Sequence, residues 1–418
     1  MNRKKKWIAL VLAGTMAFGL YGCKGGNDPG ENRDRIQGEK TSCLTEGIQA
    51  GSSNAKEPDD VFRKAYGQFA AGLFRETYKT GAEFISPYSA YAALAMVLNG
   101  ADGATLEDMC KTFGLSADEL NAYLKVFADR YNNGQSVTVA NSVWFNGSFR
   151  EEVRKEFLQT VAGYYSAEAF SADFSDPKTL GDMNAWVEEK TLGRIKDMLD
   201  QLDAGAVMVL FNTLTFDGKW ADPFDKEATK EEDFRKAGGQ TGRVQMMSGE
   251  AEAYFESETY IGFEKNYEDG FYFRAYLPKE GYTAKQLAEA LSGDQLANPG
   301  TYDGKAYVKM PKITLKSNMM DLIPALTALG MGSAFGGAAN FSRITNSGVP
   351  ILISEVNQKT YLEIDEEGTK AATATEVGLR CYAAAPVPVN HTVVLDSPFI
   401  YMICDRTTDI PLFIGIYE

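Results

Sequence analysis

Histidine is almost absent from this chain, which has one, His391, among its 418 residues. An enzyme that activates serine or cysteine with histidine would have to use this single imidazole. A zinc site made of several histidines is excluded. His391 lies in the segment V-N-H-T-V at 389–393, which has no neighbouring carboxylate motif. We therefore expect no catalytic residues and no metal site.

A positive surface and nucleotide-binding motifs are missing as well. The formal net charge is −15 and the isoelectric point is about 4.8, which argues against nucleic acid as a partner because phosphates need a basic surface. The chain has no P-loop and no G-x-G-x-x-G motif after a strand, so we expect no nucleotide cofactor. The five cysteines are spaced neither as a disulfide framework nor as a CxxC metal site.

The N-terminus has the pattern of a targeting segment. A basic run, Arg3 to Lys6, precedes an apolar stretch of fourteen residues from Trp7 to Leu20, which is short for a transmembrane helix. The next residues, L-Y-G-C at 20–23, resemble a bacterial lipoprotein cleavage site that leaves Cys23 acylated. The alternative is an ordinary signal peptide with an incidental cysteine.

These patterns divide the chain into three parts. We assign residues 1–22 to a lipoprotein signal peptide, 23–58 to a flexible tether and 59–418 to one folded domain. The tether is polar, rich in Gly, Asn, Asp, Glu and Ser, and without an apolar period. We expect a domain in the cell envelope, lipid-anchored through Cys23 to a bacterial membrane and facing the periplasm or the cell exterior.

Helix signals are concentrated in the first half of the domain and strand signals in the second. Asp59 or Asp60 can cap a first helix, and Ser86 followed by Pro87 predicts the start of a buried one. Residues 207–216 are apolar on both faces, which predicts a central strand. Other predicted elements are helices at 184–190 and 319–331 and strands at 136–145, 271–277, 307–315, 351–365, 398–404 and 411–415. Without βαβ alternation, this order predicts an α+β domain.

The run E-E-G-T-K-A-A-T-A-T-E-V-G-L at 366–379 follows the predicted strand at 351–365. Its side chains alternate, which is typical of a half-buried strand, and we find no turn signal that would fold it back. We predict an exposed strand that can be buried later. The alternative is an Ala/Thr-rich loop or short helix. The small or apolar face consists of Thr369, Ala371, Thr373, Thr375, Val377 and Leu379.

Seven segments, taken in this order, resemble the serpin family over about residues 60–418. They are F-I-S-P-Y-S at 84–89, N-A-W-V-E-E-K-T-L-G-R-I at 184–195, F-N-T-L-T-F-D-G-K-W-A-D-P-F at 211–224, Y-V-K-M-P-K-I at 307–313, E-E-G-T-K-A-A-T-A-T at 366–375, S-P-F at 397–399 and P-L-F-I-G at 411–415. The resemblance implies an α+β fold with three β-sheets, eight to nine helices and an exposed reactive-centre loop.

The resemblance also implies a function. It predicts an irreversible suicide-substrate inhibitor of serine endopeptidases, with cysteine endopeptidases as a further class, whose cleaved loop inserts into the main sheet. We expect a monomer whose partner is a chymotrypsin-like or broad serine protease. Two alternatives stay open. One is a non-inhibitory serpin that acts as a surface binding module, and the other is a ligand-capturing lipoprotein on an unrelated α+β fold.

Three groups of residues carry this implication. The hinge of the loop would be Glu366, Glu367, Gly368, Thr369, Ala371, Ala372, Thr373, Ala374 and Thr375. From Thr369 on, these side chains are small and would fit a packed sheet. The breach, where the loop first enters, would be Trp220, Lys312 and Glu366, with Lys312 paired to Glu366. The shutter, under the central strands, would be Ser86, Ser89, Asn212 and Gln358; the family often has histidine where this chain has Gln358, so we expect a pH-insensitive network.

The scissile bond follows from counting along the loop. A count of sixteen residues from Glu366 places the scissile bond between Tyr382 and Ala383. A tyrosine before the bond suits a protease whose specificity pocket accepts aromatic side chains. Counting back from Pro398 places it near Val387. Alternatively, a trypsin-like protease would cleave after Arg380, and an elastase-like protease would cleave within the alanines at 383–385.

Overall fold

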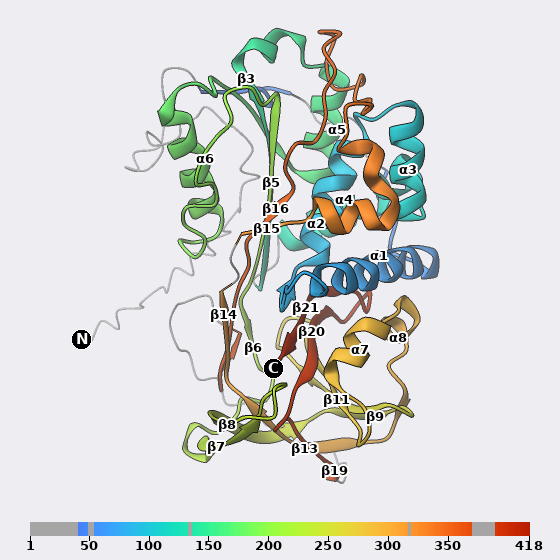
Figure 1. The fold of residues 1–418 in the computed structure, drawn as a ribbon, viewed down its shortest axis with the longest axis vertical. Helices are drawn as coiled ribbons and strands as arrows, with labels where there is room; N and C mark the ends of the chain where they lie inside the picture. Colours follow the sequence, from blue (N-terminus) through green and yellow to red (C-terminus); the bar gives the residue numbers. More distant parts are fainter. Residues whose placement is uncertain (1–40, 49–53, 133–135, 317–318, 370–388) are drawn as a thin grey trace, which may run out of the picture.

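The computed structural model describes residues 41–48, 54–132, 136–316, 319–369 and 389–418. The molecule is elongated, with most helices gathered in one half and most short strands in the other (Figure 1). Among the described residues, no helix combines the length and apolarity needed to cross a bilayer.

Five helices form the bulk of the helical half: α1 (Asp60–Tyr78), α2 (Pro87–Leu98), α3 (Gly103–Phe113), α4 (Ala117–Asn132) and α5 (Lys155–Tyr165). The two predicted starts are confirmed. The Asp59 carboxylate accepts the Phe62 N–H at 3.1 Å, and the Ser86 hydroxyl accepts the Ser89 N–H at 3.3 Å. Helix α2 is almost entirely buried, as its apolar sequence predicts.

A long four-stranded sheet lies between these helices and α6 (Pro177–Lys190) (Figure 1). Its strands, in the order β1-β4-β3-β5, are β1 (Ser42–Cys43), β4 (Glu168–Ala172), β3 (Val137–Asn146) and β5 (Met208–Phe216). A separate apolar cluster, which includes Trp144, Phe170, Trp186 and Phe211, fills the space between α6 and the sheet.

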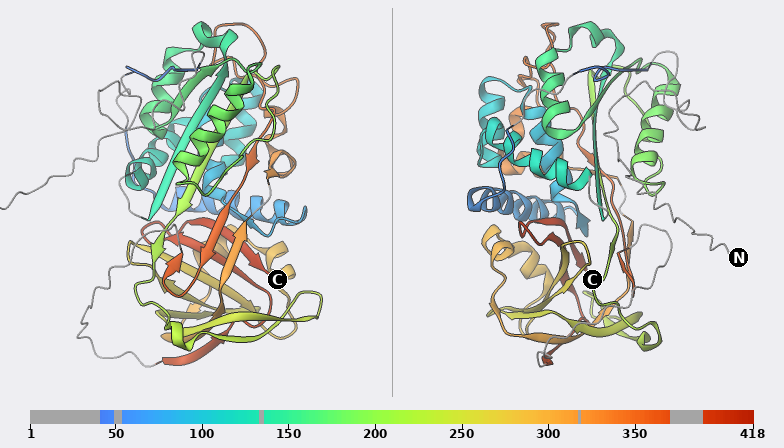
Figure 2. Two further views of the ribbon diagram at one scale, coloured as in Figure 1. Left: turned by 90° about the vertical axis from the view of Figure 1, so that its left-hand side faces the viewer. Right: turned by 180° about the vertical axis from the view of Figure 1, so that it is seen from behind.

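Two further pieces continue this layer along its length (Figure 2). One has the order β14-β17-β18-β6, made of β14 (Ile313–Lys316), β17 (Tyr361–Ile364), β18 (Gly368–Thr369) and β6 (Gly218–Lys219), and β6 follows β5 directly along the chain. The other pairs β15 (Met320–Asp321) with β16 (Asn357–Gln358). We call the three pieces together the principal sheet.

The other half of the molecule contains two more sheets. One has seven strands: β12 (Thr301–Tyr302), β9 (Ala253–Glu256), β10 (Tyr260–Asn266), β11 (Phe271–Pro278), β20 (Phe399–Asp405), β21 (Pro411–Tyr417) and β2 (Phe84–Ile85). The second has four: β19 (Val389–Val394), β13 (Lys305–Pro311), β8 (Thr241–Ala251) and β7 (Lys230–Arg235). Helices α7 (Ala284–Ala290) and α8 (Gly293–Ala297) lie beside the seven-stranded sheet (Figure 1). The α+β class is therefore confirmed.

Several predicted elements differ from the structure. The predicted strand at 307–315 is divided between β13 and β14, which belong to different sheets. Of the predicted strand at 351–365, only β16 and β17 form, and the predicted helix at 319–331 begins only at α9 (Ile323–Leu326), because Met320 and Asp321 pair with β16. Strand β5, predicted to be central, is bound within its four-stranded sheet by β3 alone.

Part of the segment assigned to the tether is ordered against the sheet. Ser42 and Cys43 pair with Ser171 and Phe170 of β4, and the Leu44 N–H donates to the Ala169 carbonyl at 2.7 Å. Cys43 is disulfide-bonded, which the cysteine spacing did not predict, whereas Cys110 and Cys404 are free thiols.

Candidate functional site

The hinge begins with a tight turn that the sequence analysis missed. Asp365 N–H donates to the Gly368 carbonyl at 2.8 Å, Gly368 N–H donates back to the Asp365 carbonyl at 3.3 Å, and the Asp365 carboxylate accepts the Glu367 N–H at 2.9 Å. The segment D-E-E-G thus reverses the chain, and Thr369 pairs antiparallel with Ile364. Asp at the first and Gly at the fourth position of a β-turn is a usual signature. The prediction that no turn folds the run back was wrong.

Gly368 and Thr369 already lie inside the principal sheet. Gly368 has φ +148°, and a Cβ there would meet the Gly218 carbonyl oxygen at 2.1 Å, so only glycine fits this position. Thr369 is 2% exposed, and its hydroxyl shares a 2.7 Å hydrogen bond with the hydroxyl of Tyr267. The start of the hinge is therefore buried between β17 and β6, not exposed as the sequence suggested.

The breach places Glu366 among positive and polar groups. Its carboxylate lies 2.8 Å from the Lys312 ammonium and accepts the Thr229 hydroxyl at 2.7 Å. Burial would raise the pKa of Glu366, but the hydrogen bonds from Lys312 and Thr229 outweigh burial and hold the pKa below its usual range. The predicted contact between Lys312 and Glu366 is present.

Trp220 and Phe224 hold the same turn through their main chain. The Trp220 N–H donates to the Glu367 carbonyl and the Phe224 N–H to the Glu366 carbonyl, both at 2.9 Å. The Trp220 indole N–H also donates to the Asp365 carbonyl at 2.9 Å. The Trp220 ring is 1% exposed and stacks on Tyr267 at 4.2 Å between ring centroids. The breach therefore binds the hinge through main-chain hydrogen bonds, the indole N–H of Trp220 and the ion pair between Lys312 and Glu366.

The shutter joins α2 to the principal sheet through amides. Gln358 is bidentate on Ser86: its carbonyl oxygen accepts the Ser86 N–H and its amide N–H donates to the Ser86 carbonyl, both at 2.9 Å. The Ser89 hydroxyl donates to the side-chain oxygen of Asn212, and the Asn212 amide donates to Asn141. The structure thus brings the four predicted residues into one uncharged network.

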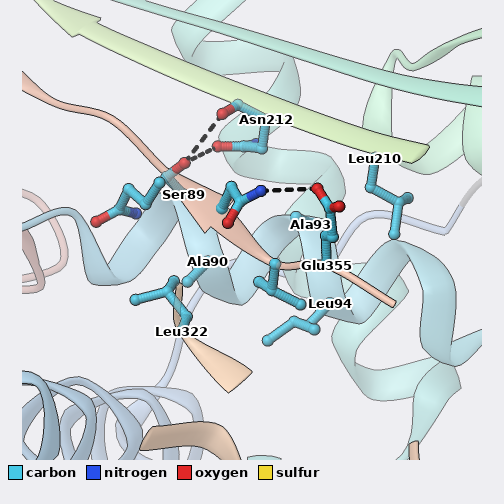
Figure 3. Close-up of a pocket in the computed structure, with 11 residues that line it drawn as sticks. Ser89, Ala90, Ala93, Leu94, Leu210, Asn212, Leu322 and Glu355 are labelled. Atoms are coloured by element: carbon cyan, nitrogen blue, oxygen red, sulfur yellow. Dashed lines mark hydrogen bonds between the residues drawn. The ribbon is translucent and has the colours of Figure 1, made fainter. Parts of the chain in front are cut away.

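Strand hydrogen bonding is interrupted at the shutter. Within the described residues, β5 pairs with β3 and β16 pairs with β15, and no ladder joins β5 to β16 or β17. A cavity occupies this interruption above α2 (Figure 3). It is lined by Ser89, Asn212 and Gln358 of the shutter, together with Ala90, Ala93, Leu94, Leu210, Leu322, Glu355, Val356 and Asn357. We call it the strand gap; Leu210 and Asn212 of β5 line one side and Asn357 and Gln358 of β16 the other.

Several predicted site residues lie outside the described residues. These are Cys23, the later hinge residues Ala371, Ala372, Thr373, Ala374 and Thr375, and the candidate scissile-bond residues Arg380, Tyr382, Ala383 and Val387.

Four residues of the site were missed by the sequence analysis: Asn141, Phe224, Thr229 and Tyr267. Asn141 offered a signal, because an amide in the apolar strand 136–145 needs a buried partner, and it lies directly opposite Asn212 in the β3–β5 register. Thr229 and Tyr267 offered none, because only the tertiary fold brings them to the hinge.

The comparisons with known proteins agree with this geometry. The family model described as serpin (serine protease inhibitor) matches residues 64–418. Alpha-1-antiproteinase S of Cavia porcellus is 31% identical over 391 residues, covering 89% of this chain and 94% of that protein. The native state of tengpin, a thermophilic serpin, superposes with a TM-score of 0.80 at 35% identity, covering 90% of this chain and 99% of tengpin.

Tengpin in its latent state also superposes, with a TM-score of 0.74 at 32% identity, covering 87% of this chain and 98% of tengpin. Serpins are protease inhibitors and generally not catalytic enzymes. The ordered motifs, the fold and the family match lead to one conclusion: the chain belongs to the serpin family.

Proposed function

We propose that this chain is an irreversible suicide-substrate inhibitor of serine endopeptidases. A target protease attacks the loop after the hinge as a substrate and forms an acyl-enzyme, and the cleaved hinge then inserts as a strand between β5 and β16–β17. The observation that carries the proposal is the interruption of hydrogen bonding at the strand gap, with β18 already seated between β17 and β6 at the breach.

Insertion is downhill for physical reasons. A strand that fills the gap pairs two edges that the described residues leave without a ladder, and about ten new hydrogen bonds at roughly 1 kcal/mol net each would favour it. Thr369 is already buried, and insertion would add Ala371, Thr373, Thr375, Val377 and Leu379 on the same face. None of them carries a charge, so burying them avoids the large cost of desolvating one.

The comparison with the two states of tengpin supports the proposal. The chain superposes better on tengpin in its native state than on tengpin in its latent state, with TM-scores of 0.80 and 0.74. In the proposed cycle, this is the state that meets the protease.

We assign the scissile bond to Tyr382–Ala383 and the target to a chymotrypsin-like or broad serine protease. The test incubates residues 23–418 with chymotrypsin-like, trypsin-like and elastase-like proteases. We expect an SDS-stable complex with the first class, and mass spectrometry of the released fragment should place the cut after Tyr382. Cleavage without any complex would overturn inhibition in favour of the non-inhibitory alternative.

Matched variants separate the candidate bonds. Tyr382→Asp should abolish the complex with the chymotrypsin-like protease, whereas Arg380→Ala should leave it unchanged. The reverse pattern, with a trypsin-like protease forming the complex, would move the bond to Arg380. A cut after Val387 would support the count from Pro398.

We also propose that the domain is lipid-anchored to a bacterial membrane through Cys23. Acylation would use the Cys23 sulfur and start the mature chain at that residue. Mass spectrometry of the N-terminal peptide of the natively produced protein tests this: we expect a lipid-modified Cys23, and a Cys23→Ser variant should leave the membrane fraction. An unmodified N-terminus at another residue would overturn the anchor without touching the inhibitor proposal.

A further inference from the structure

Lys265 of β10 is a buried lysine directly behind the breach. Its side chain is 1% exposed, and its ammonium donates one hydrogen bond, to the Glu250 main-chain carbonyl at 2.7 Å. The same nitrogen lies 4.6 Å from the ring centroid of Phe224 and 5.8 Å from that of Trp220. An ammonium has three donors, so aromatic faces replace part of the hydration that burial removes.

The nearby carboxylates do not form an ion pair with Lys265. Glu252 accepts the main-chain N–H of Asn266 at 2.9 Å, and the Glu250 carboxylate lies 3.5 Å from the Lys305 ammonium. Asp222 is exposed. In direct contact, the charge of Lys265 therefore has one carbonyl and two rings, and the three carboxylates attract it from farther away.

Those two rings belong to residues whose main chain binds the hinge. Phe224 and Trp220 are the residues whose main-chain N–H groups donate to the Glu366 and Glu367 carbonyls. A cation beside both rings, whose centroids are 5.9 Å apart, attracts the two rings and so helps to fix the position of the two donors. An apolar side chain of the same length would fill the space without this directional attraction.

We propose that Lys265 is a positioning residue for loop insertion, which holds Trp220 and Phe224 in place so that their amides bind the hinge at Glu366 and Glu367. The inference rests on the proposed inhibitory function and adds a residue that the hinge, breach and shutter do not include. It also separates function from stability, because an uncompensated buried charge costs folding free energy.

The charge of Lys265 can be switched by pH. Burial lowers the pKa of Lys265 below its usual range, against the attraction of Glu252, Asp222 and Glu250, while Lys305 acts in the same direction as burial. Neutral Lys265 has no cation–π attraction. Raising the pH toward the ordinary lysine pKa of about 10.4 therefore removes the attraction before exposed lysines titrate. Burial raises the pKa of Tyr267, the ring stacked on Trp220, so this ring does not titrate in the same window.

Two measurements on the uncleaved protein test the proposal without any protease. The first is tryptophan fluorescence from pH 7 to 11, with a Trp220→Phe spectrum subtracted to isolate Trp220. We expect one step below the pH at which exposed lysines titrate, absent in Lys265→Met and in Lys265→Arg, whose guanidinium stays charged. Lys305→Met, the matched control, should keep the step.

The second measurement is amide hydrogen exchange of the peptide that contains Trp220 and Phe224. We expect about fivefold faster exchange in Lys265→Met, with recovery in Lys265→Arg, while the thermal midpoint of Lys265→Met is unchanged or higher. A lower midpoint with unchanged local exchange would show a merely structural role and overturn the proposal, as would a fluorescence step that persists in Lys265→Met.

The consequence for inhibition is measured last. With the protease that forms the stable complex, Lys265→Met should need about fivefold more inhibitor per protease, and Lys265→Arg should restore the ratio. If the wild-type chain forms no complex with any protease, the inhibitory function fails while fluorescence and exchange still decide the role of Lys265. If Lys265→Met shows faster amide exchange at Trp220 and Phe224 but an unchanged ratio of inhibitor to protease, Lys265 has no role in insertion.

Discussion

The breach and the shutter lie along the same layer of the principal sheet and differ in chemistry. At the breach the sheet is continuous through β18, and the hinge is held by charge, with Glu366 beside Lys312. At the shutter no ladder of the described residues joins β5 to β16, and the contacts are amides and hydroxyls, with Gln358 on Ser86 and Asn212 on Ser89. In the proposed inhibitory cycle, the breach would select which side chains enter the sheet, and the shutter would hold the strands apart until they enter.

The largest expected effect is at the entrance. Thr369→Arg puts a charge at a position that is 2% exposed, where burial costs several kcal/mol. We expect the stable protease complex to fall at least about a hundredfold relative to the cleaved product, measured by gel densitometry. Thr369→Ser keeps the hydroxyl that meets Tyr267 and should inhibit normally. Full inhibition by Thr369→Arg would break the assignment of the breach as the point of entry.

The next effect is at the shutter. Gln358→Leu leaves the buried Ser86 N–H without its partner, which costs about 1 to 3 kcal/mol, and removes one of two hydrogen bonds to the Ser86 carbonyl, which keeps the Ala90 N–H at 3.4 Å. We expect the uncleaved protein to lose about 2 kcal/mol or more in denaturant unfolding. The neighbouring Asn357→Ala, which removes a contact with Glu355 at the surface, should cost less than about 0.5 kcal/mol. Equal losses of unfolding free energy in the two variants would show that the contact between Gln358 and Ser86 does not stabilise the uncleaved protein.

Acid should weaken the breach and not the shutter. The pKa of Glu366 is lowered in the folded state, so its contribution is complete above the unfolded carboxyl pKa of about 4.3 and is lost as the pH falls through the folded pKa. We expect Glu366→Gln to remove about 1 kcal/mol of acid-dependent stability between pH 5 and 3, an estimate for a charged hydrogen bond. Glu151→Gln, at a carboxylate that is 91% exposed, should leave the pH profile unchanged.

The smallest effect concerns the second ion pair of the hinge. Lys226 and Glu367 are 62% and 42% exposed, and such pairs contribute little because water screens them. Lys226→Ala should change stability by less than about 0.5 kcal/mol and leave inhibition intact. A large loss of stability or inhibition in Lys226→Ala would show that the breach holds the hinge mainly through Glu367 and not through Glu366.

Local signals predicted much of the fold. The cap at Asp59, the Ser86–Pro87 helix start and the strand at 207–216 all follow from residue preferences that act over one turn or one strand. The breach and shutter residues were found because their motifs match a family, and the structure brings them together.

The rest depends on tertiary context. The chain from Tyr307 to Leu315 has one continuous apolar pattern but serves two sheets, because it leaves one at Pro311 and joins the other at Ile313. The hinge turn at D-E-E-G had a usable local signature that was overlooked. Lys265 could not be found at all, since nothing in a strand of apolar and charged residues says which side chain will face a tryptophan far away in the sequence.

The short strand β1 protects the outer border of the principal sheet. Without it, β4 would present free main-chain donors and acceptors to solvent, and such borders invite other chains to join. A chain shortened to begin at residue 54 should therefore self-associate at concentrations where the longer chain stays single, which sedimentation would reveal. Residues 41–48, which the sequence analysis assigned to the tether, would then protect the sheet from aggregation.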